Sequence, residues 1–459
     1  MSMLSLPYTI AWYVFLFVVL WLLQRLTHWM TQLNIFTLFI GFLVLRHGIT
    51  VPLDHTVNQW YAHIDVSPQA YVRFYTSLVL MWVCLLVSIT FARLLLGSVR
   101  LNPHAFQNAM RRQPMPAGVN WFFLVVVLVC VGLIVVYQLR FDTSLTSLLT
   151  GQLSSADYRE MRDNYSAATN YSVGLGSHLA SIARFGLMPG LVGILYFLSR
   201  HGWGWRIMFF AVLALNLIVG LLSGQKGASV FLLVTLSLAY YYKRGNLNLR
   251  LRNWRIWALL TAALFSITCL YHLQYPEQDL GWAWRATTYR LTSEADRCLQ
   301  LYFEIYPEVQ PFMHGKSSGL INTVLRADVS PDNQPERFIP IYYLGPEYPN
   351  TWNAAYIGVA WADFGYYGVI FESLFVGGLL YSYARWFRNA RKTALVMGVQ
   401  VGLMMSATRL SEVGLTANLL SFGLLSGFLV YALVHIISVA ERSHSRLEHS
   451  SNANIASCS

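Results

Sequence analysis

The stretch WRATTYRLTSEADRCLQLYFEIY, residues 284–306, decides how this chain is organised. It lies in a mostly polar segment, residues 273–350, which separates two strongly apolar parts of the sequence. Apolar side chains recur at helical spacing along one face: Leu291, Ala295, Cys298 and Tyr302. Charged side chains line another face: Arg290, Glu294 and Arg297. The pattern predicts an amphipathic helix at the centre of a folded cap.

The apolar parts are typical of a membrane protein. Hydrophobic residues make up 56% of the 459 residues, charged residues only 12%, and the mean hydropathy is +0.45. A helix needs about 20 apolar residues to cross a bilayer. Eleven segments qualify, near residues 8–24, 34–52, 70–96, 120–138, 178–199, 206–222, 228–242, 254–272, 353–384, 393–408 and 413–438. We therefore expect an all-α polytopic membrane protein with about 11 transmembrane helices and a large structured cap between the eighth and the ninth.

These segments divide the chain into four parts. Residues 1–272 are predicted to hold transmembrane helices 1 to 8, with outer loops at 52–69 and 140–177. Residues 273–350 form the cap, and residues 351–440 hold helices 9 to 11. The tail, residues 441–459, is rich in Ser, His and Asn, which is typical of disorder. No cleavable signal peptide is evident in the first residues.

Basic residues gather in one set of alternate loops and predict the orientation. They are Arg25, Arg93, Arg100, Arg111, Arg112, Arg200, Arg206, Lys243, Arg244, Arg250, Arg252, Arg255, Arg385, Arg388, Arg391, Lys392, Arg442 and Arg446. Positively charged loops stay in the cytoplasm, so we expect the N-terminus outside, the C-terminus inside and the cap outside. The net charge of +11 is then mostly a topology signal, which excludes a nucleic-acid-binding function.

Several charged residues outside the cap are candidate ligands. Lys226 stands in a short turn with glycine on both sides, where a lysine could bind an anion or simply extend to the interface. Arg159 and Arg162 would share a helix face in the second outer loop, as they would on an ordinary surface helix. Arg409 could bind substrate or form a structural ion pair with Glu412. A further arginine, Arg184, lies inside a predicted span, where it could also reach the interface.

Motifs in and after the cap resemble a known family. They are His314-Gly315-x-Ser317, Arg326, a proline-containing stretch, Thr351, Asp363-Phe364-Gly365 and Gly368, preceded by Gly224-Gln225-Lys226-Gly227 between two spans. Their order and spacing, with the number of spans and the large outer loop, resemble the bacterial oligosaccharide repeat-unit polymerases, the O-antigen polymerases. Related O-antigen ligases usually have Arg at the position of Lys226 and a His-Asn pair near Asn353, and this chain departs from both.

The resemblance implies a membrane glycosyltransferase of the GT-C type that acts at the periplasmic face of the bacterial inner membrane. Its partners would be undecaprenyl-diphosphate-linked glycans and membrane lipids, with a chain-length regulator protein as a candidate partner. A hydroxyl of a new repeat unit would attack the anomeric carbon of the growing chain and release undecaprenyl diphosphate. The family is thought to be independent of metal, and we expect no cofactor and no metal site here.

This reaction needs fixed cations for the leaving group and a base for the hydroxyl. The candidate cations are Lys226, Arg290, Arg297, Arg326, Arg409, Arg159 and Arg162. The candidate bases are His314, Glu294 and Asp363. Each base has a structural alternative, because His314 could cap a turn, Glu294 could pair with Arg290 and Arg297, and Asp363 could cap or ion-pair at a helix start.

Two other functions compete with the polymerase. An O-antigen ligase, which moves a glycan to a lipid core, is the nearest alternative. A polysaccharide transporter or flippase would need internal repeats and charges near the bilayer midplane. The sequence shows no internal repeat, and its outer charges gather around one cap.

Overall fold

The computed structural model describes residues 6–49, 64–111, 121–140, 175–222, 226–245, 247–248, 261–262, 264–269, 271–272, 278–318, 334–345 and 351–437. Within these residues the regular elements are all helices. Five are long and apolar enough to cross a membrane: Tyr8–Thr27, Pro68–Leu96, His178–Leu198, Tyr356–Asn389 and Ala394–Ser411. Five shorter apolar helices accompany them: Ile35–His47, Trp121–Val136, Trp203–Val219, Val230–Lys243 and Ser426–Ile437. The chain is a polytopic all-α membrane protein, and the count of eleven spans stays a prediction.

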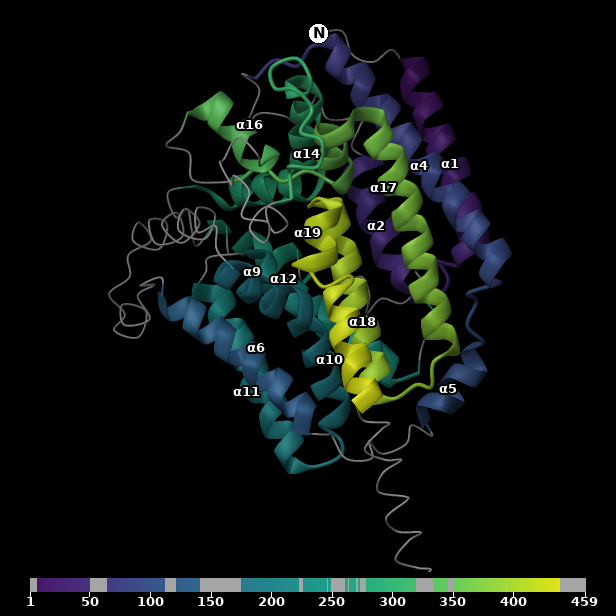
Figure 1. Cartoon of the computed structure of the whole chain (residues 1–459), viewed down its shortest axis with the longest axis vertical. Coiled ribbons are helices and arrows are strands. Elements are labelled where there is room, and N and C mark those ends of the chain that lie inside the picture. The colour runs from purple at the N-terminus through teal and green to yellow at the C-terminus, as the bar shows by residue number, and fades with distance from the viewer. Residues whose placement is uncertain are drawn as a thin grey trace, which may run out of the picture.

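The long helices lie side by side, and the cap closes one end of the bundle (Figure 1). The N-terminal half contributes α1 (Leu6–Thr27), α2 (Ile35–His47), α4 (Pro68–Leu96), α5 (Pro103–Arg111) and α6 (Trp121–Arg140). Next come α9 (Leu175–Ser181), the π-helical turn η1 (Ile182–Leu187), α10 (Met188–Leu198), α11 (Trp203–Leu222) and α12 (Lys226–Lys243). The cap holds α14 (Leu280–Ile305) and α16 (Pro335–Leu344). The chain returns through α17 (Tyr356–Asn389), α18 (Ala394–Thr408), the short 3-10 turn η3 (Arg409–Ser411), α19 (Leu415–Leu420) and a last helix, Ser426–Ile437.

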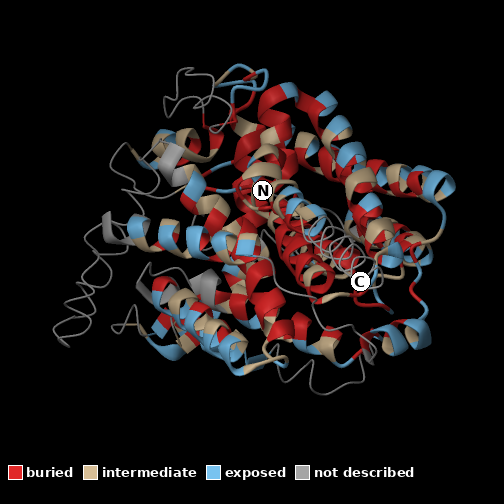
Figure 2. Cartoon of the chain, turned by 60° about the horizontal axis from the view of Figure 1, so that its bottom comes forward, coloured by how far each residue is buried: buried red, intermediate tan, exposed pale blue. Residues whose placement is uncertain are grey.

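Helix α18 is the centre of the bundle, and α2, α10 and α12 pack around it. Outer helices such as α1 and α4 bury one face and expose large apolar side chains on the other, as their colouring shows (Figure 2). Phe17 is 71% exposed and Leu94 is 79% exposed, which a water-soluble surface would not tolerate in such number. These faces suit contact with lipid tails.

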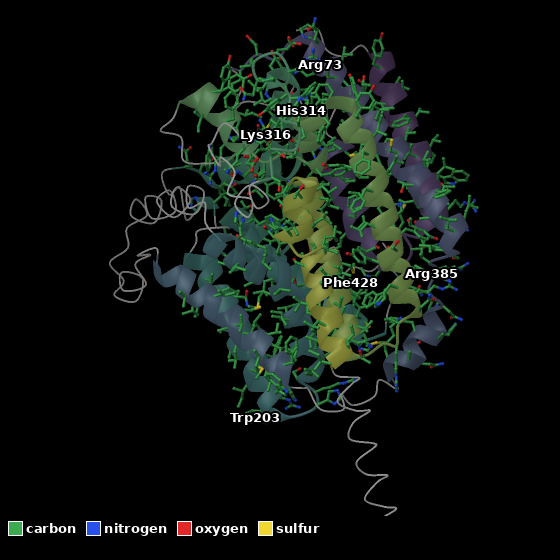
Figure 3. The ribbon with its side chains drawn as sticks, viewed as in Figure 1. Arg73, Trp203, His314, Lys316, Arg385 and Phe428 are labelled. Atoms are coloured by element: carbon green, nitrogen blue, oxygen red, sulfur yellow. The ribbon has the colours of Figure 1, made fainter. Side chains whose placement is uncertain are left out.

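Several basic residues of the predicted cytoplasmic loops hold neighbouring segments together. Arg93 donates to the carbonyl of Arg25 at 2.9 Å, and Arg385 donates to the carbonyl of Ser98 at 3.0 Å. Arg385 and Trp203 lie toward the end of the bundle away from the cap, whereas Arg73, His314 and Lys316 lie at the cap end (Figure 3). The orientation predicted from the basic loops stays a prediction.

The predicted amphipathic helix is confirmed as α14. It begins four residues earlier than expected because Asp279 caps it, accepting a hydrogen bond from the backbone N–H of Trp282 at 2.5 Å. Ala295, Cys298 and Tyr302 are buried as predicted. Arg297, predicted on the charged face with Arg290 and Glu294, is also buried, although Arg290 is exposed. The reason is that the second half of α14 is enclosed by α2, α4 and α17 and has no free face.

Candidate functional site

Two arginines converge on one pocket at the cap end of α18. Arg409 is the first residue of η3, and Arg184 lies in the π-helical turn η1. Both line a pocket between α10, α11, α12 and α18, together with the polar side chains of Asn216 and Thr235. Its remaining walls are apolar: Phe185, Met188, Pro189, Val192, Phe231, Leu232 and Met405. The pocket thus combines cationic and strongly apolar surface.

The size of the pocket limits what can enter. Its cavity volume is about 60 Å³. A water molecule needs at least ~10–15 Å³ on this scale, so the cavity holds a few waters or one group of phosphate size. A chain of sugars is too large for this volume.

Aromatic rings hold the two guanidinium groups in place. The Arg409 guanidinium carbon lies 3.7 Å from the ring centroid of Phe231 and 5.7 Å from those of Phe185 and Phe422. The Arg184 guanidinium carbon lies 5.0 Å from the centroid of Phe185. Contacts of this kind favour Arg, whose planar guanidinium stacks on aromatic rings and also matches the geometry of carboxylate and phosphate oxygens. Phe185 thus contacts both cations of the pocket.

Arg409 also forms the ion pair predicted with Glu412. Its Nη1 donates to Glu412 Oε2 at 2.6 Å, and Arg46 at the end of α2 forms a second ion pair with the same carboxylate. One acid therefore faces two bases, so the group of Arg46, Arg409 and Glu412 keeps a net positive charge. Arg409 therefore pairs with Glu412 and lines the pocket at the same time.

Lys226, a predicted cation, lies close to this pocket along the chain. It is the first residue of α12, and Phe231 in the pocket wall follows five residues later. Five residues of helix rise about 7.5 Å. The side chain of Lys226 is outside the described part of the structure, as are Gly224 and Gln225 in the turn before it.

Two other predicted cations, Arg290 and Arg297, do not line this pocket. Arg290 is 58% exposed on α14 and pairs with Glu294 at 3.2 Å, as the structural alternative for Glu294 expected. The Nη1 atom of Arg297 donates to Gln300 at 3.1 Å, and Nη2 donates to the carbonyl of Ile64, so this guanidinium holds the chain entering α4. Arg159, Arg162 and Arg326 lie outside the described residues.

The His-Gly-x-Ser motif inside the cap contacts the Asp-Phe-Gly motif that follows the cap. Helix α17 is broken at Gly365, where φ is 61° and ψ is −142°. Near this break, the backbone N–H groups of Met313 and His314 donate to the carbonyls of Ala362 and Asp363 at 2.9 and 3.0 Å. The Asp363 carboxylate in turn accepts from Gly315 N at 3.0 Å, Ser317 N at 3.4 Å and Ser317 Oγ at 2.5 Å. The His-Gly-x-Ser turn is therefore fixed to α17 by Asp363.

The two candidate bases, His314 and Asp363, differ in how far their side chains are engaged. The carboxylate of Asp363 already accepts three hydrogen bonds, which is what a turn-capping acid does. His314 has φ 51° in the turn and an exposed side chain, with its ring 6.2 Å from that of Phe364. The imidazole is therefore presented at the surface of the cap by a backbone that Asp363 and α17 hold.

Two features of the site were missed or undervalued in the sequence. Arg184 is explained from sequence by a side chain that reaches the interface, although an arginine inside a span is by default a functional candidate. Glu336 on α16 was not singled out. Burial raises the pKa of its carboxyl and nearby Asp363 adds to this, while a backbone hydrogen bond and Arg337 lower it by less. An acid in the first turn beside Arg337 gave no sequence signal of such burial.

A comparison with known proteins identifies the family of this chain. Residues 185–419 match the family model described as "Putative O-antigen polymerase", which covers more than half of the chain. The chain belongs to the O-antigen polymerase family. No curated protein and no solved structure matches it. The family implies an enzyme acting on lipid-linked glycans, and the matched region contains Arg409, Lys226 and the whole cap.

Proposed function

We propose that the protein polymerises undecaprenyl-diphosphate-linked oligosaccharide repeat units, as a GT-C-like glycosyltransferase at the periplasmic face. A hydroxyl of the incoming repeat attacks the anomeric carbon of the growing glycan. A new glycosidic C–O bond forms while the C–O bond to the diphosphate breaks. The hydroxyl proton passes to a base, and undecaprenyl diphosphate leaves with the electron pair.

The arginine pocket is the observation that carries this proposal. A lipid diphosphate is a compact anion attached to an apolar chain, and the pocket pairs Arg184 and Arg409 with an apolar wall that includes Val192 and Met405. Charge develops on the diphosphate as the bond breaks, so cations fixed in advance stabilise the transition state. In the proposal Lys226, on α12, and Arg290, on the cap helix α14, add positive charge near the leaving diphosphate.

His314 is the residue we propose as general base. Its ring is exposed, and Asp363 holds the turn that carries it. Gly414, two residues after Glu412, packs so closely on α17 that a Cβ there would lie 2.9 Å from Val359, one turn before Asp363. The His314 turn and the segment carrying Arg409 are thus attached to the same stretch of α17. Glu294 is the alternative base, but its carboxylate is already paired with Arg290.

The reaction itself is tested with purified protein and a chemically defined lipid-linked repeat unit. The expected product is a ladder of glycans that differ by one repeat, with undecaprenyl diphosphate released in equal number to the bonds formed. A single transfer to a lipid core acceptor, without a ladder, would contradict a polymerase and support the ligase alternative.

A further inference from the structure

Two irregular segments meet beside the arginine pocket. In η1 the helix widens, and the N–H of Met188 donates to Ala183, five residues back. After α19 ends at Leu420, the helical structure is interrupted until the helix Ser426–Ile437 begins. In this break the N–H groups of Leu424 and Leu425 donate to the carbonyls of Asn418 and Leu419 at 3.2 and 3.0 Å.

The two segments touch through a pair of glycines. Gly423 has φ +91°, and a Cβ placed on it would lie 2.4 Å from the carbonyl oxygen and 2.5 Å from the Cα of Gly186 in η1. Both neighbours are backbone atoms, so no side chain could rotate out of the way. Alanine at position 423 would have to push η1 or the break aside.

Tyr431, in the second turn of the last helix, makes a second contact with η1. Its hydroxyl donates to the carbonyl of Leu187, the last residue of η1, at 2.7 Å, and its side chain is buried. A widened turn needs partners for the carbonyls that it displaces from the α-helical pattern. The same helix thus contacts η1 through its preceding break and through a hydrogen bond.

We propose that Gly423 and Tyr431 are positioning residues that hold the π-helical turn and so direct Arg184 into the diphosphate pocket. The extra residue in a π turn rotates the segment before it by about 100° relative to an α-helix, because each residue of an α-helix turns by that amount. Arg184 lies within η1, two residues before Gly186. Its direction therefore depends on whether the wide turn is kept.

This inference rests on the proposed function, because it concerns binding of a lipid diphosphate at the Arg184–Arg409 pocket. The measurement is the dissociation constant of the purified protein for farnesyl diphosphate, a short lipid diphosphate. The variants are Gly423→Ala, Tyr431→Phe, Arg184→Ala and the two double variants with Arg184→Ala. Gly427→Ala is the matched control, since a Cβ there would lie 3.4 Å from the same Gly186 carbonyl, an ordinary contact.

We expect Arg184→Ala to weaken binding by about 10- to 100-fold, the effect of losing a charged hydrogen-bond donor. Gly423→Ala should weaken it by a similar factor, Tyr431→Phe by a smaller one, and Gly427→Ala should bind as wild type does. In the Arg184→Ala background the two positioning variants should cause no further loss. This non-additivity separates positioning from a general loss of structure.

Wild-type affinity in Gly423→Ala and Tyr431→Phe would overturn the inference, and so would a full further loss in the Arg184→Ala background. If Gly423→Ala fails to fold, the inference is tested by the nearly isosteric Tyr431→Phe alone, by comparing its effect on affinity with and without Arg184→Ala. If wild-type protein does not bind farnesyl diphosphate while its melting temperature is normal, the proposed function of the pocket fails instead.

Discussion

Glu412 shows how one residue can serve both stability and the site. It is the shared partner of Arg46 on α2 and Arg409 in the pocket. Burial by itself would raise the pKa of its carboxyl, but Arg46 and Arg409 outweigh this, so the pKa is lower than the ordinary 4.5. The geometry thus keeps Glu412 ionised, and the cation facing the pocket is held in one direction.

The sign of this pKa shift gives a prediction about pH. A carboxyl whose pKa is depressed in the folded state contributes stability above its unfolded pKa and loses it as pH falls through the lower folded value. Stability from Glu412 should therefore be complete above about pH 4.5 to 5 and decline below that. Melting temperatures of wild type and Glu412→Gln in detergent should differ most at neutral pH and converge in acid. A difference that stays constant down to pH 3 would contradict this role.

At the scale of elements, α14 has two different halves. Its first half packs on the chain near Thr268 and Tyr271, with Arg290 and Trp284 exposed. Its second half is enclosed, and Asp296 there is fully buried and contacts His47 Nδ1 at 2.7 Å. The other ring nitrogen of His47 lies 3.3 Å from the carbonyl oxygen of Ser411 in η3. One histidine therefore joins the cap helix to the segment that carries Arg409.

Breaking this buried pair should destabilise the protein strongly. His47→Ala leaves the Asp296 carboxylate without its imidazole partner, and removal of one member of a buried pair costs about 3–5 kcal/mol. We expect a marked drop in melting temperature and a cap that is cleaved more readily by protease. The control is Arg290→Ala, which breaks an exposed pair worth about 1 kcal/mol or less. Equal melting temperatures for the two variants would show that His47 does not anchor the cap.

The elements were more predictable than the contacts between them. Periodicity located α14 within a few residues, because its apolar spacing is local information. It could not show that Arg297 is buried, since that depends on α4 and Ile64, more than two hundred residues away in sequence. Likewise the motifs at His314 and Asp363 were visible separately, but the hydrogen bonds between them depend on the break at Gly365. Neither local sequence indicates that Arg184 and Arg409 line the same pocket.

At the scale of the whole molecule, charge and architecture suggest one orientation. The cap with α14 and α16 lies at one end, and Arg385 of a predicted cytoplasmic loop lies toward the other (Figures 1 and 3). Basic ends of membrane bundles face the cytoplasm. A donor lipid whose diphosphate enters beside Arg409 would then reach the pocket from the outer leaflet. This orientation is part of the proposal.

Reporter fusions test the orientation directly. Fusions after Gly118 and after Asn248 should report the cytoplasm, because both lie in basic loops. A fusion between residues 310 and 334 in the cap should report the periplasm. The inverse pattern would place the pocket on the wrong side for a periplasmic polymerase and would remove that part of the account.

The central claim is that Arg184 and Arg409 bind the diphosphate of the donor lipid. Its most direct test is the polymerisation rate of the purified Arg184→Ala/Arg409→Ala variant with a defined lipid-linked repeat, beside wild type and an Arg73→Ala control. Arg73 pairs with Glu308 at the surface of the cap end, so its loss should leave the rate unchanged. Removing one charge-stabilising group typically costs about 10²–10³-fold in rate, so the double variant should form no detectable ladder. A ladder of wild-type length and rate from the folded double variant would contradict the claim.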